Sequence, residues 1–429
     1  MITCTAWRGK RYAVLGLARS GAATVAALIA SGAAVTAWDS DAARRDAAQG
    51  QGITIADLEA TDLTGFDALV LSPGVPLNRH LLAAQARAAG VPIIGDVELF
   101  AQARAELPPH KVVGITGTNG KSTTTALIHH ILQTAGVPSL MGGNIGLPVL
   151  SRDPLPAGGV YVLELSSYQI DLTQSLDCDV AVLLNITPDH LDRYDGFDGY
   201  AAAKARLFAM QRGNGTAIIA IGDAASAAIA RSLSVRGEYL IKIAPGFCMD
   251  QSRWPSLQGP HNAQNALAAI NVAEALGVPA PVIDRALESF RGLPHRMETV
   301  AVRNGVRFVN DSKATNADSA APALAAYDRI HWILGGQAKA ASLDACAKSF
   351  LHVVRAYLIG EAAPLFAPLL DGQVPVENAG TLANAVAAAA VAARPGETVL
   401  LSPACASFDQ FRDFEDRGDQ FRALVEALP

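Results

Sequence analysis

The segment HKVVGITGTNGKSTTT at residues 110–125 carries the residue types that bind a nucleoside triphosphate. Its apolar start predicts a strand, its glycines predict a turn, and the apolar periodicity that follows predicts a helix beginning near Gly120-Lys121-Ser122. Such a helix N-terminus offers main-chain N–H groups to an anion, while the lysine reaches the outer phosphates and the hydroxyl reaches a magnesium ion. The strict pattern G-x-x-x-x-G-K-S has glycine where this chain has Ile115, but context favours a triphosphate site over an ordinary turn. The residues predicted to contact the nucleotide are Gly117, Thr118, Asn119, Gly120, Lys121, Ser122 and Thr123.

Polar side chains follow two neighbouring predicted strands in the same region. Glu164 ends the apolar run 160–163, and His190 follows the run 180–184. Ligands of open α/β sheets gather at the carboxyl ends of strands, and magnesium favours one or two carboxylates together with phosphate oxygens. We therefore interpret Glu164 and His190 as metal ligands, with a solvated strand-terminal acid and a hydrogen-bonded structural histidine as the alternatives. Lys204 lies in a predicted helix, where its surroundings alone indicate a solvent-exposed lysine.

The first 40 residues predict a β-α-β unit with a glycine-rich turn, Gly16 to Gly21, after its first strand. Asp39 ends the second strand, roughly where an acid meets the ribose in dinucleotide folds. Ala18, however, occupies the position where a glycine lets the backbone approach a pyrophosphate. We therefore favour another nucleotide over NAD at these strand ends. Further strands are predicted at 68–71 and 92–94.

The last third of the chain repeats the α/β alternation, with hydroxyl, small and basic residues after each predicted strand. Examples are NDSKATN at 310–316, GGQAK at 335–339 and SPACAS at 402–407. This chemistry suits an anionic ligand. Before it, Asn262 and Asn265 share one face near the start of a predicted helix, where they could bond a purine or a ribose. N-capping is the alternative for one of these two asparagines.

Composition excludes several classes of protein. Half of the 429 residues are hydrophobic, which excludes a disordered chain, and the net charge of −6 gives no basic surface for nucleic acid. The five cysteines include no C-x-x-C pair and indicate reduced thiols. The alanine- and valine-rich run 385–393 is far shorter than the roughly 20 residues of a membrane span, and no signal-peptide pattern is present. We expect a cytoplasmic protein without nucleic-acid or membrane partners.

Together these motifs resemble the Mur ligases, the ATP-dependent amide ligases of bacterial cell-wall precursor synthesis. The matching segments occur in family order: TGTNGKST at 116–123, GGNIG at 142–146, NITPDHLD at 185–192, the helix from Tyr200 to Lys204, GPHN at 259–262, PHR at 294–296 and NDSKATN at 310–316. Within the family, the segments at 311–315 and 402–407 and the later Phe414 resemble members that add D-glutamate to UDP-N-acetylmuramoyl-L-alanine.

The resemblance implies an α/β fold of three domains. Residues 1–104 would form an N-terminal Rossmann-like domain for the UDP substrate, 105–293 a central P-loop-type ATPase domain, and 294–429 a C-terminal Rossmann-like domain for glutamate. It also implies ATP and two magnesium ions as cofactors, UDP-N-acetylmuramoyl-L-alanine and D-glutamate as substrates, and an acyl-phosphate intermediate. We expect a monomer.

Carried over position by position, the resemblance assigns roles to individual residues. Lys121 would hold the β- and γ-phosphates, Ser122 and Glu164 one magnesium ion, and His190 the second. Lys204 matches the family lysine that is carbamylated into a metal ligand, which reverses its interpretation as a surface lysine. The residues assigned to the nucleotide and the reaction centre are Asn262, Asn265, His295, Arg296, Asp311 and Lys313. Those assigned to the UDP site are Leu17, Ala18, Asp39, Ser40, Gly74 and Asn144, and those assigned to glutamate are Thr315, Lys339, Ser407 and Phe414.

Three positions depart from the family pattern. Ser40 replaces a common threonine, the usual glycine after Lys339 is missing, and Arg19-Ser20 makes the first glycine-rich turn bulkier and more basic. The rival interpretations are a folylpolyglutamate-synthase-like ligase, a nicotinamide-dependent oxidoreductase and a non-catalytic nucleotide-binding regulator. The N-terminal unit and the 402–407 loop argue against the first, and the second leaves the triphosphate site unexplained. A regulator has no chemical reason to keep all the predicted phosphate and metal ligands.

Overall fold

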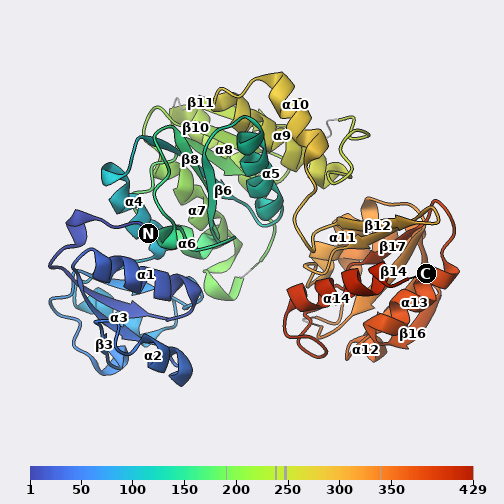
Figure 1. The fold of residues 1–429 in the computed structure, drawn as a ribbon, viewed down its shortest axis with the longest axis horizontal. Helices are drawn as coiled ribbons and strands as arrows, with labels where there is room; N and C mark the ends of the chain where they lie inside the picture. The colour runs from blue at the N-terminus through green and yellow to red at the C-terminus, as the bar shows by residue number, and fades with distance from the viewer. Residues whose placement is uncertain (190, 237–238, 246–248, 339, 429) are drawn as a thin grey trace. The chain divides into compact units, whose positions relative to one another are not determined.

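The computed structural model describes residues 1–189, 191–236, 239–245, 249–338 and 340–428 (Figure 1). The chain forms two compact units, the first comprising Met1–Phe247 with Leu267–Ala286 and the second comprising Cys248–Ala266 with Leu287–Pro429. The first unit contains two sheets and the second contains one. Each sheet is flanked by helices, which confirms the predicted α/β fold class.

The N-terminal sheet has five parallel strands in the order β3-β2-β1-β4-β5. From β1, the chain adds β2 and β3 on one side and then β4 and β5 on the other. The glycine-rich turn after β1 therefore lies where the strand order reverses, which is the position where such sheets bind ligands. The strands are β1 (Arg11–Leu15), β2 (Ala34–Trp38), β3 (Thr54–Ile55), β4 (Ala68–Leu71) and β5 (Ile93–Ile94). The helices are α1 (Arg19–Ala30), α2 (Ala42–Ala48), α3 (Leu81–Ala88) and α4 (Asp96–Ala103).

The second sheet has six parallel strands in the order β11-β10-β9-β6-β8-β7. Its central strands are apolar because both faces are covered, and β8 is buried along its whole length. The strands are β6 (His110–Thr116), β7 (Ser139–Gly143), β8 (Gly159–Glu164), β9 (Val180–Leu183), β10 (Thr216–Ala220) and β11 (Tyr239–Ile243). The helices are α5 (Lys121–Thr134), α6 (Ser167–Asp171), α7 (Gly196–Ala209) and α8 (Ala224–Arg236), followed by α9 (Pro260–Ala275) and α10 (Ala280–Ser289).

The third sheet has the order β12-β13-β17-β14-β15-β16, with β12 antiparallel to β13 and the other pairs parallel. A two-residue turn, Asn304-Gly305, joins β12 to β13, and both residues have the positive φ that tight hairpins need. The strands are β12 (Glu298–Arg303), β13 (Val306–Asn310), β14 (Ile330–Gly335), β15 (Val353–Ile359), β16 (Val376–Gly380) and β17 (Thr398–Leu401). The helices are α11 (Ala317–Ala325), α12 (Ala363–Leu370), α13 (Leu382–Ala392) and α14 (Phe414–Glu426).

Short 3-10 helices complete the chain: Thr5–Trp7, Leu58–Ala60, Arg104–Glu106, Val149–Ser151, Leu191–Arg193 and Asp344–His352. In the first unit, one continuous apolar core joins the two sheets. Within it, the ring centroids of Phe100 in α4 and Tyr161 in β8 lie 4.9 Å apart. In the second unit, separate cores cover the two faces of the third sheet. Among the described residues, no helix is long and apolar enough to cross a membrane.

Candidate active site

The predicted triphosphate turn lies between β6 and α5, as expected. Gly120 adopts φ +86° immediately before α5, a conformation that favours glycine. The Thr118 N–H donates to the Asn185 carbonyl (2.9 Å), and the Asn185 side chain pairs with both polar groups of the Asn119 main chain (2.8 and 3.1 Å). The sequence analysis assigned no role to Asn185. Its two side-chain hydrogen bonds to the Asn119 main chain fix the turn in one conformation.

Two lysines meet beneath this turn. The Lys121 Nζ donates to the carbonyls of Gly117 and Thr118 (2.8 Å each), and the Lys204 Nζ donates to the same Gly117 carbonyl (2.9 Å). The interpretation of Lys204 as solvent-exposed is wrong, because only 1% of the residue is accessible. It lies on the buried face of α7, together with Tyr200 and Leu207, at helical spacing. Burial, reinforced by the Lys121 charge, holds the pKa of Lys204 well below its usual value.

Glu164 ends β8 beside the turn and is only 2% exposed. Its Oε1 accepts from the Asn144 Nδ2 (2.9 Å), whereas its buried Oε2 has no hydrogen-bond partner among the described residues. A buried carboxylate oxygen without a partner is costly unless a cation or a donor meets it. Ser122 is also buried, in the first turn of α5. These oxygen donors fit a magnesium ion that also contacts phosphate.

The structure describes only some of the predicted metal ligands. His190 lies outside the described residues. Within the described part of the chain, no three His, Cys, Asp or Glu side chains form a metal-binding cluster. Asn144, assigned by resemblance to the UDP site, is placed directly against Glu164.

Apart from Asn144, the residues predicted for the UDP site gather at the carboxyl edge of the N-terminal sheet. Asp39 follows β2 and accepts from the main-chain N–H groups of Leu17 (2.6 Å) and Asp41 (2.9 Å) and from Arg44 (3.4 Å). Burial alone would raise the pKa of Asp39, but these hydrogen bonds outweigh it and hold the pKa below its usual value. Leu17 and Ala18 form the turn between β1 and α1, Ser40 follows Asp39, and Gly74 lies in the turn after β4.

In the second unit, Asp311 and Lys313 follow β13. Asp311 is buried and accepts from the Ser402 Oγ (2.8 Å) and the Met297 N–H (3.1 Å). The Lys313 Nζ lies 3.5 Å from the centroid of the Phe414 ring, so two residues predicted for neighbouring ligands are in contact. Thr315 is half-buried and Ser407 is buried, whereas Lys339 lies outside the described residues.

Arg417 of α14 joins the loops that carry these residues. It is fully buried, and its guanidinium donates to Ser312 Oγ (2.9 Å) and to the carbonyls of Ser312 (2.9 Å) and Cys405 (3.0 Å). Burial lowers its pKa to about 10. No sequence pattern indicated this role, because the contact with Ser312 joins positions 105 residues apart in the chain.

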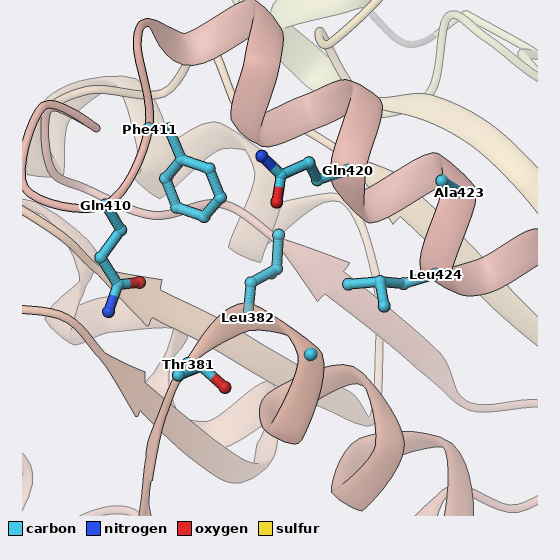
Figure 2. A pocket seen from close by; sticks show the side chains of 8 residues that line it. Thr381, Leu382, Gln410, Phe411, Gln420, Ala423 and Leu424 are labelled. Atoms are coloured by element: carbon cyan, nitrogen blue, oxygen red, sulfur yellow. The ribbon is translucent and has the colours of Figure 1, made fainter.

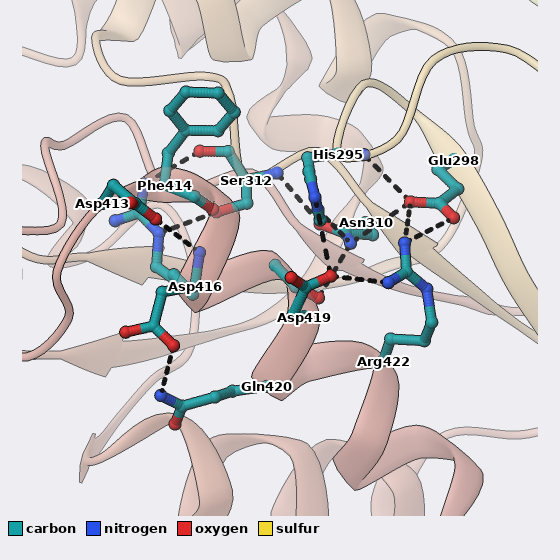
Figure 3. A network of polar contacts seen from close by, with 12 residues as sticks. His295, Glu298, Asn310, Ser312, Asp413, Phe414, Asp416, Asp419, Gln420 and Arg422 are labelled. Atoms are coloured by element: carbon teal, nitrogen blue, oxygen red, sulfur yellow. Dashed lines mark hydrogen bonds and ion pairs between the residues drawn. The ribbon is translucent and has the colours of Figure 1, made fainter.

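His295 is held inside the second unit rather than open to solvent (Figure 3). Its Nδ1 lies 3.1 Å from the Asn310 Nδ2 and its Nε2 lies 3.7 Å from Asp419 Oδ1. A Cβ added at Gly418 would overlap the imidazole, which explains a glycine within α14. The backbone of His295 has φ +62°, a conformation that costs free energy in a non-glycine residue. Burial lowers the pKa of this histidine.

Asn262 and Asn265 also belong to the second unit, where both are buried in α9. The Asn265 Nδ2 donates to the Asn262 Oδ1 (3.1 Å), which confirms that they share one helix face. Because α9 begins at Pro260, neither asparagine is its N-cap, so the capping alternative is wrong. Arg296, the remaining predicted residue, is half-buried next to His295.

A pocket between the N-terminus of α13 and α14 contains none of the predicted residues (Figure 2). Its lining is uncharged: Thr381, Leu382, Ala383, Gln410, Phe411, Gln420, Ala423 and Leu424. An amino acid with two carboxylates would find no cation among these side chains. The pocket is therefore a poor glutamate site.

The burial of Asp311 predicts a pH-dependent stability. Desolvation raises its pKa from 3.8 to about 7, so its contribution to stability is fully present below pH 3.8 and is lost as the pH rises through 7. Asp311→Asn has no proton to lose. The stability of this variant relative to the wild type should rise by up to about 4 kcal/mol between pH 4 and 8. Denaturant unfolding of both proteins across this range measures the difference, and a constant difference would contradict the assignment.

Three family models match the chain. Residues 10–95 match "Mur ligase MurD-like, N-terminal domain", residues 115–246 match "Mur ligase middle domain" and residues 295–405 match "Mur ligase, glutamate ligase domain". Two curated relatives, both called UDP-N-acetylmuramoylalanine--D-glutamate ligase, align with the whole chain. The protein of Novosphingobium aromaticivorans is 63% identical over 97% of its own length, and that of Sphingopyxis alaskensis is 62% identical over 100% of its length.

Structural comparison supports the fold independently. UDP-N-acetylmuramate-alanine ligase MurC of Thermotoga maritima superposes with a TM-score of 0.60 at 16% identity, covering 97% of this chain and 99% of that one. UDP-N-acetylmuramoylalanyl-D-glutamyl-2,6-diaminopimelate--D-alanyl-D-alanyl ligase of Acinetobacter baumannii gives a TM-score of 0.58 at 20% identity, covering 87% and 92%. The three domain matches and the full-length relatives show that the chain belongs to the Mur ligase family.

Proposed function

We propose that this protein is an ATP- and magnesium-dependent ligase that adds D-glutamate to UDP-N-acetylmuramoyl-L-alanine in peptidoglycan precursor synthesis. The observation that carries the proposal is the triphosphate turn with the buried, unpartnered Oε2 of Glu164 beside it, among the residues that the structure describes. The names of the relatives supply the substrates, and their identity above 60% over the whole chain makes the transfer reasonable.

In the proposed reaction, a carboxylate oxygen of the muramoyl-alanine attacks the γ-phosphorus of ATP, and ADP leaves. The amine of D-glutamate then attacks the acyl-phosphate carbonyl, loses a proton, and expels inorganic phosphate. Lys121 would neutralise charge on the transferring phosphoryl group, a task that is mostly positioning and electrostatic. Bound by Ser122, Glu164, His190 and modified Lys204, two magnesium ions would supply further charge neutralisation there.

We also propose that Lys204 is carbamylated. Its lowered pKa favours the neutral amine, which is the form that attacks carbon dioxide and releases a proton to give a carbamate. The Nζ atoms of Lys121 and Lys204 both donate to the Gly117 carbonyl. A carbamate on Lys204 would bring a negative charge close to the Lys121 ammonium and would add an oxygen ligand for magnesium.

The remaining sites follow the same proposal. Leu17, Asp39 and the Gly74 turn would bind the uridine diphosphate moiety. Lys313 would bind the nucleotide, and Phe414 would bind glutamate. The sheets support domains at 1–104, 105–293 and 294–429, one sheet in each. We also propose that the protein is a monomer and that it acts in the cytoplasm, where ATP and nucleotide sugars are made.

Phosphate release tests the function. The protein would be incubated with ATP and magnesium, with and without UDP-N-acetylmuramoyl-L-alanine, adding D-glutamate, L-glutamate, glycine or lysine separately. We expect release only when the nucleotide sugar and D-glutamate are both present. Release with L-glutamate alone would change the product but keep the chemistry. Absence of release with every amino acid would contradict the proposal and favour a folate-type ligase or a regulator.

A further inference from the structure

Arg193 connects two parts of the first unit that the proposed function treats separately. It ends the short helix Leu191–Arg193, three residues after His190. Its Nη1 donates to the Gly74 carbonyl (2.9 Å), and its Nη2 donates to the carbonyls of Val75 (2.8 Å) and Pro73 (3.3 Å). The side chain therefore extends from the central sheet to the turn after β4 in the N-terminal sheet.

The turn that Arg193 binds supports the predicted uridine-diphosphate site. Gly74 is one of the residues assigned to that site, and Ser72 precedes it at the end of β4. A Cβ added at Gly16 would clash with the Ser72 side chain, so the glycine-rich turn after β1 packs directly on this segment. A displacement of residues 73–75 would consequently move the turn after β4 and disturb the glycine-rich turn after β1, which packs on it.

The guanidinium of Arg193 also packs on α6, the helix that follows Glu164 in the chain. Its guanidinium carbon lies 4.1 Å from the centroid of the Tyr168 ring, a cation–π contact. Tyr168 belongs to α6, which starts three residues after Glu164 and is fixed at its N-terminus by a capping box between Ser166 and Gln169. Arg193 is thus joined to the strand end that carries Glu164 by way of one short, well-capped helix.

The chemistry of arginine suits this arrangement. Three carbonyl oxygens that converge on one point repel each other unless a multivalent donor lies between them. The guanidinium has five N–H donors in one plane and can stack on a ring at the same time, which the compact ammonium of lysine cannot do equally well. The shape of the group, in addition to its charge, therefore fixes the geometry.

We propose that Arg193 is a positioning residue that couples nucleotide-sugar binding at the Gly74 turn to ATP binding beside the predicted metal site. This inference rests on the proposed function. A ligand that orders either end of the Arg193 contacts pre-orders the other end, so each ligand strengthens binding of the other by the same factor. A group that only fastens the two sheets together would affect stability without affecting this factor.

Calorimetric titration measures the coupling. The affinity for UDP-N-acetylmuramoyl-L-alanine would be determined with and without magnesium and a non-hydrolysable ATP analogue, for the wild type, Arg193→Gln, Arg193→Lys and Arg206→Gln. Arg206 is a matched control, because it is an exposed arginine of α7 that donates to a single carbonyl, that of Thr173 (3.0 Å). We expect at least about fivefold coupling in the wild type and in Arg206→Gln. Both Arg193 variants should lose it, since the lysine substitution keeps the charge but removes the planar fork.

Three outcomes would separate this inference from the function on which it rests. Full coupling in folded Arg193→Gln, or independent binding of the two ligands to the wild type, would overturn the inference alone. Failure of the wild type to bind either ligand would overturn the proposed function. If thermal unfolding shows that Arg193→Gln does not fold, Arg193→Lys and Tyr168→Leu carry the test, and full coupling in both would again overturn the inference.

Discussion

Replacement of Glu164 by glutamine is expected to lower turnover about 100- to 1000-fold, the usual cost of removing one group that stabilises transferring charge. The substitution preserves the shape of the side chain. It also keeps the oxygen atom, Oε1, that accepts a hydrogen bond from the Asn144 Nδ2. It removes the negative charge on the buried Oε2, which has no partner within the described residues. Steady-state phosphate release at saturating substrates measures the loss.

The same variant separates a metal ligand from a structural acid. Because the wild type buries an unsatisfied carboxylate oxygen, Glu164→Gln should be at least as stable as the wild type without ligands. Magnesium with an ATP analogue should then raise the melting temperature of the wild type by more than that of the variant. Glu274→Gln, which changes an exposed carboxylate of α9, is the control. Wild-type turnover in Glu164→Gln would remove Glu164 from the site.

Replacement of Lys204 by alanine should abolish most activity, and short carboxylates such as acetate or propionate should restore part of it. The truncated side chain leaves a space beneath the triphosphate turn, and a carboxylate that enters it would replace the oxygens of the carbamate. Phosphate release as a function of carboxylate concentration gives the rescue. Carbon-13 NMR of the wild type equilibrated with labelled bicarbonate should show the carbamate signal directly.

Lys121→Ala is the matched control for this rescue. Both lysines donate to the Gly117 carbonyl, but only Lys204 is proposed to act as an anion. Carboxylates should therefore rescue Lys204→Ala and leave Lys121→Ala inactive. Full activity of Lys204→Ala without any carboxylate, or equal rescue of both variants, would contradict the carbamylation.

The central strands of all three sheets were predictable from their apolar runs, because both faces of these strands are covered. Most strands that the sequence analysis missed lie at sheet edges: β3, β7, β11, β12 and β16. Exposed and partly buried residues interrupt the apolar pattern in these strands, as in β12 and β16. The Asn304-Gly305 pair was an available hairpin signal for β12. β10 is an interior strand, and its short apolar run was overlooked.

The candidate site was only partly predictable. The triphosphate turn and Glu164 follow from local pattern, because each is positioned by the strand directly before it. The burial of Lys204 also had a local signal, the apolar face that it shares on α7. By contrast, the roles of Asn185, Arg193 and Arg417 depend on contacts between segments far apart in the sequence, which no spacing of residues reveals.

Transfer of oxygen-18 tests the central claim most directly. The carboxylate of UDP-N-acetylmuramoyl-L-alanine would be labelled with oxygen-18, the reaction run to completion with ATP, magnesium and D-glutamate, and the released phosphate analysed by mass spectrometry. An acyl-phosphate route predicts that one labelled oxygen leaves with each phosphate, because the attacking carboxylate oxygen becomes the bridging oxygen. Unlabelled phosphate accompanied by formation of the amide product would contradict the mechanism.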